Sequence, residues 1–347
     1  MTKDLKNIII LGATGAVGKE VIKLLNQKFI PYNNLKLLAS ASSAGKRQLI
    51  NGKTYFIEEV KERSFMDFDL AIFCVDSSLS KYYAPFAIAS GCQVIDNSAH
   101  FRMDSSVPLI VPEVNIGTYK NQEIIANPNC CTILLTVALN PIHQLYQIKE
   151  INVSTYQSAS GAGANGMNEL MEQTRVIGSQ IDETNNIYIE NKPYSVKVFG
   201  RRYLWNVFSH NSEIDMESGY NNEELKMIEE TKKIFDDAEM EVNATCVRVP
   251  VLRSHCESVS IVLEKPSTVE EIRECLENAA GVVVLDNREE NIFPEPRFST
   301  YKEAVYVGRI RQRFGDTTGR KFELFLSGDQ LMKGAALNAL QIAKKIF

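Results

Sequence analysis

Residues 7–18 read Asn-Ile-Ile-Ile-Leu-Gly-Ala-Thr-Gly-Ala-Val-Gly, and this stretch decides the fold class of the first part of the chain. Ile8–Leu11 is a short apolar run that stops at Gly12, and residues 16–29 then carry apolar side chains at helical spacing. The pattern predicts a strand, a glycine turn and a helix. Because bare N–H groups and the positive end of a helix dipole can hold a pyrophosphate at such a turn, it favours dinucleotide binding over a merely structural turn.

Further short apolar runs, bounded by turn residues, suit a parallel sheet that is buried on both faces. They lie at residues 35–38, 70–75, 94–96, 109–111 and 124–126. Residues 1–127 are therefore predicted to form a doubly wound α/β domain of the Rossmann type.

The second half of the chain has a different texture, with longer segments of alternating polarity that predict an α+β domain built on a mixed or antiparallel sheet. These segments lie at residues 151–158, 246–251, 257–263 and 306–313. Polar stretches at residues 182–194 and 209–224 are predicted to be surface loops or subunit contacts, and residues 334–346 an alanine-rich final helix.

Composition excludes several classes of protein. The 347 residues suggest about two domains, and the net charge of −5, without a basic stripe, argues against a nucleic-acid partner. Seven cysteines without CxxC spacing fit neither a disulfide framework nor a zinc knuckle, so we expect no metal and reduced thiols in the cytoplasm. No apolar run approaches the roughly 18 residues of a membrane span, and no signal-peptide pattern is present, so we expect no membrane partner.

The choice of dinucleotide is read from residues 35–40, the end of the second predicted strand. An NAD site usually has an acidic residue there for the ribose 2′-hydroxyl, and this chain has none. Ser40 and Ser43 supply hydroxyls, and Lys46 and Arg47 supply positive charge for a 2′-phosphate, which favours NADP. A solvated basic loop explains Lys46 and Arg47 equally well when each is taken singly.

Cys130 is the candidate nucleophile. It follows a predicted strand at residues 124–126 and a turn at residues 127–129, and so lies in the first turn of an amphipathic helix, where the dipole lowers a thiol pKa. An inert packed thiol is the alternative. It stays the default for Cys131, which lies about 100° further round the helix. The same default covers the remaining cysteines, Cys74, Cys92, Cys246, Cys256 and Cys275.

A thiolate nucleophile needs a proton partner, and the chain has four histidines. His255 lies just past the predicted strand that carries Arg248. If that strand runs along a cleft, Arg248 can grip a carboxylate while His255 shuttles a proton. From spacing alone, a surface arginine and a loop histidine remain the default. Glu223 and Lys226 lie three apart on a predicted helix, where the default is a solvated ion pair.

An ordered set of motifs runs along the whole chain, and it resembles that of the bacterial aspartate-β-semialdehyde dehydrogenase family. The motifs lie at residues 12–18 (GATGAVG), 96–98 (DNS), 101–104 (FRMD), 111–115 (VPEVN), 127–130 (NPNC), 156–163 (YQSASGAG), 223–227 (EELKM), 245–251 (TCVRVPV), 255 (H) and 333–338 (KGAALN). The resemblance implies a Rossmann-like NADP domain at residues 1–127 with the C-terminal helix 330–347. It also implies a catalytic and dimerisation domain at residues 128–329.

The resemblance also implies roles for residues. Cys130 matches the nucleophile, His255 the acid/base group that takes its proton, and Gln157 the residue that orients the intermediate. Substrate contacts are implied at Arg248 for the α-carboxylate, Glu223 for the ammonium group, Arg102 and Lys226 for the phosphate, and Asn129 beside the nucleophile. NADP contacts are implied at Gly12, Thr14, Gly15, Ala16, Val17, Ser40, Ser43, Ser160, Gly161 and Gln330.

The implied reaction is the NADPH-dependent reductive dephosphorylation of L-β-aspartyl phosphate to L-aspartate semialdehyde, with release of inorganic phosphate. It proceeds through a thioester on Cys130 and serves the biosynthesis of lysine and diaminopimelate, threonine, methionine and isoleucine. The family implies a homodimer or homotetramer.

Three positions depart from the family pattern: Ser42 replaces a common arginine, residues 75–78 replace a stretch with two glycines, and Cys131 replaces the usual serine. Asp76, in the altered stretch, is expected to contact or crowd a ribose. Two alternatives stay open. One is another phosphorylating aldehyde dehydrogenase such as N-acetyl-glutamyl-phosphate reductase, against which Glu223 and Lys226 argue. The other is a catalytically silent dinucleotide-binding regulatory protein.

Overall fold

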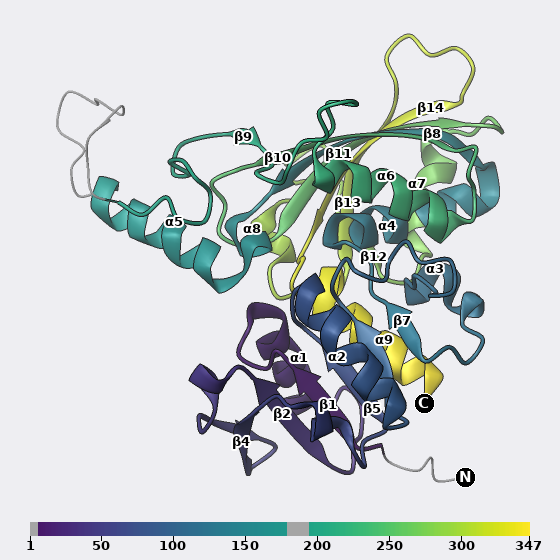
Figure 1. Cartoon of the computed structure of the whole chain (residues 1–347). Coiled ribbons are helices and arrows are strands. Elements are labelled where there is room, and N and C mark those ends of the chain that lie inside the picture. The colour runs from purple at the N-terminus through teal and green to yellow at the C-terminus, as the bar shows by residue number, and fades with distance from the viewer. Residues whose placement is uncertain (1–5, 179–193) are drawn as a thin grey trace.

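The computed structural model describes residues 6–178 and 194–347, and its framework is two seven-stranded sheets (Figure 1). Apart from residue 194, the loop predicted at residues 182–194 lies outside the described residues. Within them, no helix is both long enough and apolar enough to cross a membrane.

The first sheet has the strand order β3-β4-β2-β1-β5-β6-β7 and confirms the doubly wound α/β prediction. All of its strand pairs are parallel except β3 with β4. Its strands are β1 (Ile8–Leu11), β2 (Leu35–Ala39), β3 (Arg47–Ile50), β4 (Lys53–Glu59), β5 (Leu70–Phe73), β6 (Gln93–Asp96) and β7 (Ile124–Ala126). Its helices include α1 (Ala16–Asn26), α2 (Ser77–Ala89) and the short α3 (Pro112–Asn115).

Two features of this sheet differ from the predicted pattern. The run at residues 109–111 is not a strand: Leu109 makes only an isolated bridge to Ala126, because Pro112 begins α3 and cuts the extended run short. The hairpin of β3 and β4 was not predicted. It lies at the edge of the sheet, where most of its side chains are exposed and leave little apolar pattern.

The second sheet has the strand order β12-β13-β14-β11-β8-β10-β9 and confirms the predicted mixed sheet. β8 pairs in parallel with β10 and antiparallel with β11. Its strands are β8 (Ile148–Gln157), β9 (Phe208–Ser209), β10 (Glu241–Arg248), β11 (His255–Leu263), β12 (Val282–Val284), β13 (Val305–Gln312) and β14 (Lys321–Gly328). The helices are α4 (Cys130–Tyr146), α5 (Gly163–Gly178), α6 (Asn222–Phe235), α7 (Val269–Glu277) and α8 (Pro296–Ser299).

One large core joins the second sheet to α4, α6 and α7, which lie between this sheet and the first half of the molecule (Figure 1). The side chains predicted to face inward from α4 are all buried: Ile133, Leu134, Val137 and Ala138. Cys130, at the first turn of α4, is thereby held at the boundary between the two sheets.

The C-terminal segment returns to the first sheet. A π-helical turn at Met332–Ala336 leads into α9 (Leu337–Ile346), whose apolar side chains join the core formed by β1, β2 and α1. The predicted final helix is confirmed, although its first residues belong to the π turn. Figure 1 shows α9 in yellow in the same half of the molecule as β1 and β5.

Candidate active site

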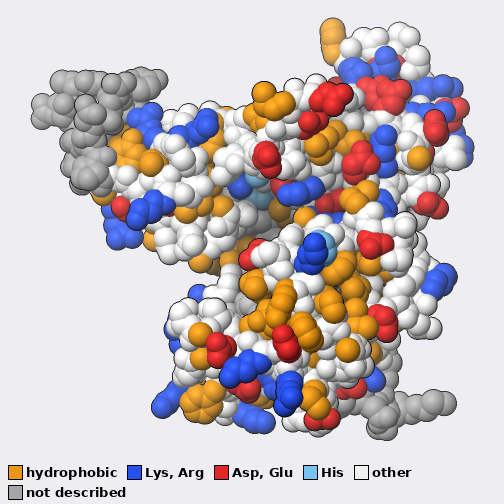
Figure 2. All heavy atoms as spheres, in the orientation of Figure 1, with side chains coloured by type: hydrophobic (Ala, Val, Ile, Leu, Met, Phe, Trp, Pro, Cys, Tyr) orange, Lys and Arg blue, Asp and Glu red, His pale blue; other side chains and the backbone are white. Residues whose placement is uncertain are grey.

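A pocket of about 390 Å³ lies where the two halves of the molecule meet. Figure 2 shows a hollow between them. Seven of the eight residues predicted for catalysis or substrate binding line this pocket: Arg102, Asn129, Cys130, Gln157, Glu223, Lys226 and Arg248. Five of the predicted cofactor residues line it as well: Ala16, Val17, Ser160, Gly161 and Gln330. The others, Gly12, Thr14, Gly15, Ser40 and Ser43, lie outside its lining.

Asn129 sets the position of Cys130. Its side-chain oxygen accepts hydrogen bonds from the backbone N–H groups of Cys131 (2.9 Å) and Thr132 (3.3 Å), so α4 begins at Cys130. Gly334 of the C-terminal segment packs directly on Cys130, since a Cβ there would lie 3.0 Å from Cys130 Cβ.

The two neighbouring thiols have opposite properties. A hydrogen bond from the Cys131 thiol lowers the pKa of Cys130 well below its ordinary value against the effect of burial, and His255 adds to the lowering. Burial raises the pKa of Cys131 well above its ordinary value, as does the neighbouring Cys130. Cys130 is half-buried and lines the pocket, whereas Cys131 is fully buried. Cys130 is therefore the thiol suited to attack.

His255 is fully buried behind the pocket, as the first residue of β11 and not in a loop. A ring nitrogen of His255 and the Sγ atoms of Cys130 and Cys131 all lie within 4.8 Å of one another. Its Nδ1 lies 3.0 Å from the backbone N of Ser158 and 3.1 Å from Ser158 Oγ, while its Nε2 has no hydrogen-bond partner among residues 6–178 and 194–347. The ring is thus anchored on one side, and its other nitrogen is unpaired.

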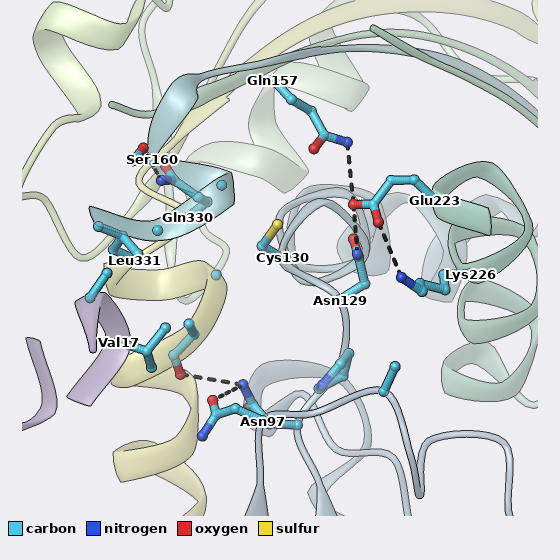
Figure 3. Close-up of a pocket in the computed structure, with 18 of the residues that line it drawn as sticks. Val17, Asn97, Asn129, Cys130, Gln157, Ser160, Glu223, Lys226, Gln330 and Leu331 are labelled. Carbon is cyan, nitrogen blue, oxygen red and sulfur yellow. Dashed lines mark hydrogen bonds and ion pairs between the residues drawn. The ribbon is translucent and has the colours of Figure 1, made fainter. Parts of the chain in front are cut away.

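Glu223 is the centre of a polar cluster in the pocket (Figure 3). Its Oε1 accepts hydrogen bonds from Asn129 Nδ2 at 2.8 Å and Gln157 Nε2 at 3.4 Å. Its Oε2 lies 3.5 Å from Lys226 Nζ, so the predicted ion pair is confirmed. The default of a solvated pair is wrong, because the Glu223 side chain is only 8% exposed.

Glu223 is ionised at neutral pH. Burial by itself would raise its pKa, but the neighbouring polar and charged groups, with His210 and Lys226 first among them, together hold the pKa at about 2. Burial and the charge of Arg248 lower the pKa of His210 to about 4. The default of a surface position for Arg248 is also wrong. It is buried, with Nη1 donating to Ser158 O at 3.2 Å and Nε donating to Asn211 Oδ1 at 3.2 Å.

Arg102 is held by a group that sequence reasoning missed. Glu230 of α6 is buried, and its Oε1 lies 3.0 Å from Arg102 Nη1 while its Oε2 accepts from the backbone N of Asn129 at 2.5 Å. Burial raises the pKa of Glu230 against the opposing charge of Arg102. The spacing from Glu223 to Glu230 is seven residues, two helical turns, and this same-face signal was available in the sequence.

Two more titratable groups, one in the pocket and one near Cys130, were missed. His210 lines the pocket, although nothing in the pattern of its loop marks it. Glu257 is fully buried, with neither carboxylate oxygen bonded, and burial raises its pKa well above the ordinary value. It follows His255 by two residues in β11 and so shares its face of the sheet, a period-2 signal that an apolar strand obscures.

The glycine turn has the geometry of a tight turn with open backbone. Gly12 has a φ of +86°, and a Cβ there would lie 2.2 Å from Cys74 O. A Cβ on Gly18 would lie 2.2 Å from Gly12 O. No side chain caps the first N–H groups of α1. These residues fit a dinucleotide pyrophosphate.

The serines beyond β2 have side-chain hydrogen-bond partners in the protein. Ser43 Oγ lies 3.5 Å from Thr14 Oγ1 and 3.4 Å from Lys46 Nζ, and Ser40 Oγ lies 3.0 Å from Ser42 Oγ. Asp76, expected to contact or crowd a ribose, caps α2: its Oδ1 accepts from the backbone N–H groups that follow it.

Comparisons with known proteins match both halves of the chain. A model described as "Semialdehyde dehydrogenase, NAD binding domain" matches residues 7–122, and one described as "Semialdehyde dehydrogenase, dimerisation domain" matches residues 139–333. The chain is 43% identical to an aspartate-semialdehyde dehydrogenase of Prochlorococcus marinus, over 97% of this chain and 94% of that one. It is 44% identical to the Synechocystis protein of the same name, over 97% and 96%.

Solved structures agree with these matches. The crystal structure of aspartate semialdehyde dehydrogenase II from Vibrio cholerae is 39% identical and superposes with a TM-score of 0.91, over 99% of this chain and 98% of that one. A structure of the same enzyme complexed with ASA is 38% identical, with a TM-score of 0.90 over the same shares of the two chains.

Proposed function

Because the chain belongs to the aspartate-semialdehyde dehydrogenase family, we propose that it reduces L-β-aspartyl phosphate to L-aspartate semialdehyde with NADPH, releasing inorganic phosphate. The chain is an oxidoreductase with a nicotinamide-dinucleotide domain. The observation that carries the proposal is a single pocket that combines a low-pKa thiol with buried groups of both charges.

The charges in the pocket fit this substrate. Arg248 pairs with the α-carboxylate through guanidinium donors that its two protein bonds leave free. Glu223, ionised and buried, faces the ammonium group. Arg102 and Lys226 take the phosphate, since the Lys226 side chain is 37% exposed and Arg102 is held facing the pocket by Glu230.

Cys130 attacks the acyl carbon as its thiolate, forming the thioester S–C bond and expelling phosphate toward Arg102 and Lys226. Gln157, which donates to Glu223, orients the acyl group beside the sulfur. When bound, NADPH supplies the hydride that reduces the thioester. His255 is the acid/base group, and the thiohemiacetal collapses to the aldehyde with return of the Cys130 thiolate. Covalent capture divides one difficult reduction into two easier steps.

NADP is proposed over NAD because β2 ends without an acidic residue. The glycine turn and α1 hold the pyrophosphate, with contacts at Gly12, Thr14, Gly15, Ala16 and Val17. Ser40 and Ser43 take the 2′-phosphate end, with Ser160, Gly161 and Gln330 at the pocket. No metal is needed in this scheme.

We also propose the domain division at residues 127 and 128, with residues 330–347 in the cofactor domain, supported by the two separate sheets. A homodimer or homotetramer assembled through residues 128–329 is supported by the match to a dimerisation domain.

The test is an absorbance assay of the reverse reaction. Reduced nicotinamide should form only when aspartate semialdehyde, inorganic phosphate and NADP are all present, with a higher kcat/KM for NADP than for NAD. Replacing the substrate with N-acetyl-glutamate semialdehyde should abolish the signal, because Glu223 then lacks its ammonium partner. No signal with aspartate semialdehyde, alongside an active control enzyme, would overturn the proposed function, and equal values for NADP and NAD would overturn the cofactor assignment.

A further inference from the structure

The surroundings of His255 determine where its ring proton lies. A backbone N–H can only donate, so Nδ1, which lies 3.0 Å from the backbone N of Ser158, has to be the acceptor in that bond. A neutral imidazole that accepts at Nδ1 carries its proton on Nε2.

A chain of buried hydrogen bonds points the same way. Gln330 Oε1 accepts from the backbone N of Ser254 at 3.0 Å, which identifies the other end of the amide, Nε2, as the donor to Ser160 Oγ. Ser160 Oγ lies 2.9 Å from Ser158 Oγ, and Ser158 Oγ lies 3.1 Å from His255 Nδ1.

The direction of this chain follows from counting protons. Each serine hydroxyl has one proton to donate, and both serines are fully buried. Ser160 Oγ accepts a hydrogen bond from Gln330 and donates one to Ser158 Oγ. Ser158 Oγ in turn donates a hydrogen bond to His255 Nδ1. Nδ1 therefore accepts from the hydroxyl as well as from the backbone of Ser158. Figure 3 shows Ser160 and Gln330 in contact beside the pocket.

We propose that Ser158, Ser160 and Gln330 are positioning residues that hold His255 in the neutral tautomer with its proton on Nε2. Nε2 lies beside Gly161, which lines the pocket, and within the described part of the chain it has no partner, so its proton is available to a bound group. A donor in this position stabilises the Cys130 thiolate and the negative charge that develops on the substrate's carbonyl oxygen. In this state Nε2 donates a hydrogen bond and has no lone pair with which to accept a proton. This catalytic consequence rests on the proposed function, whereas the tautomer itself does not.

The tautomer is measured directly by NMR of ligand-free enzyme labelled with ¹⁵N in histidine, at about pH 8, where an ordinary imidazole is neutral. The chain has four histidines, so a His255→Asn variant identifies the signals of interest. We expect the His255 Nδ1 shift of an unprotonated ring nitrogen and the Nε2 shift of a protonated one. A protonated Nδ1, or equal populations of the two tautomers, would overturn the proposal.

Gln330→Glu tests the role of the chain. It places an acceptor where Ser160 now meets a donor, so the Ser160 hydroxyl turns toward residue 330. The Ser158 hydroxyl can then donate to Ser160 Oγ in place of His255 Nδ1, which leaves the backbone N–H of Ser158 as the one remaining donor of that residue to Nδ1. The fraction of the Nδ1-protonated tautomer should rise. Gln48→Glu, the same chemical change in β3 far from the site, should leave the spectrum unchanged. A Gln330→Glu spectrum identical to that of the wild type would show that Ser160 and Gln330 do not influence the His255 tautomer. Failure of the wild-type turnover assay would count against the proposed function alone.

Discussion

Cys130 and Cys131 are adjacent in the chain, yet only one of them meets the pocket. The first turn of α4 exposes Cys130 to the substrate side and directs Cys131 into the core, where burial keeps it protonated. A protonated Cys131 is a donor to its neighbour, which is the main reason that the Cys130 pKa is low. The Cys131 thiol thus favours the thiolate form of Cys130.

Substitutions at these two positions should separate their roles. Cys130→Ala should lower turnover by more than about 10³-fold because the nucleophile is lost. Cys131→Ser keeps a donor and should retain most activity. Cys131→Ala removes the donor, so the Cys130 pKa rises and the pH profile of iodoacetamide alkylation moves to higher pH. These outcomes are checked by kcat and by alkylation rates across pH, with Cys275→Ala as the control at a distant thiol. Loss of turnover in Cys131→Ser with full activity in Cys130→Ala would show that the nucleophile was misassigned.

At the scale of elements, the site is built from the ends of strands and the starts of helices. β8 ends at Gln157, β10 ends at Arg248 and β11 begins at His255, while α4 begins at Cys130. Because β8 lies between β10 and β11, these ends meet at one edge of the second sheet. The 3₁₀ turn after β8 brings Gly161 against this edge.

Gly161 should tolerate no side chain. A Cβ there would lie 2.8 Å from Arg248 Nη1 and 3.1 Å from His255 Cε1, so Gly161→Ala pushes on both side chains, for which we propose substrate-binding and acid/base roles. We expect kcat/KM for aspartate semialdehyde to fall by about 100-fold, the cost of misplacing reacting groups by about 1 Å. Gly117→Ala, where a Cβ meets nothing within 4 Å, is the matched control. Unchanged kinetics in Gly161→Ala would contradict the described packing.

Elements with a strong local signal could be predicted from the sequence. The run at Ile8–Leu11, the glycine turn and the start of α4 were all visible as patterns. The hairpin of β3 and β4 could not be predicted, because its exposed side chains show no alternation of apolar and polar residues. The run at residues 109–111 had the pattern of a strand, but Pro112 ends it.

At the scale of the whole molecule, long-range contacts decide the site. Arg253 joins Glu20 of α1 (2.6 Å) to Asp329 (2.8 Å), so the residues before His255 are tied to the first sheet. Lys333 is fully buried and pairs with Glu113 at 2.6 Å, which fixes the C-terminal segment beside the nucleophile.

Contacts of this range explain which site residues the sequence could not identify. Most of the candidate residues came from recognised motifs, and 12 of the 18 line one pocket. Glu230 and His210 belong to no such motif. Glu230 pairs with Arg102, which lies 128 residues away in the sequence. The pKa of His210 is lowered in part by Arg248, which lies several tens of residues away. The burial of Glu223 and Arg248 likewise depends on tertiary packing, so the default expectation of solvent-exposed side chains was wrong for both.

The proposed reaction requires Cys130 to carry the acyl group. The most direct measurement is mass spectrometry of enzyme incubated with aspartate semialdehyde and NADP without phosphate, then quenched in acid. We predict one aspartyl group on the peptide that contains Cys130, removed on adding inorganic phosphate and absent in Cys130→Ala. Formation of reduced nicotinamide with no acyl group on Cys130, or with the group on another residue, would contradict the account.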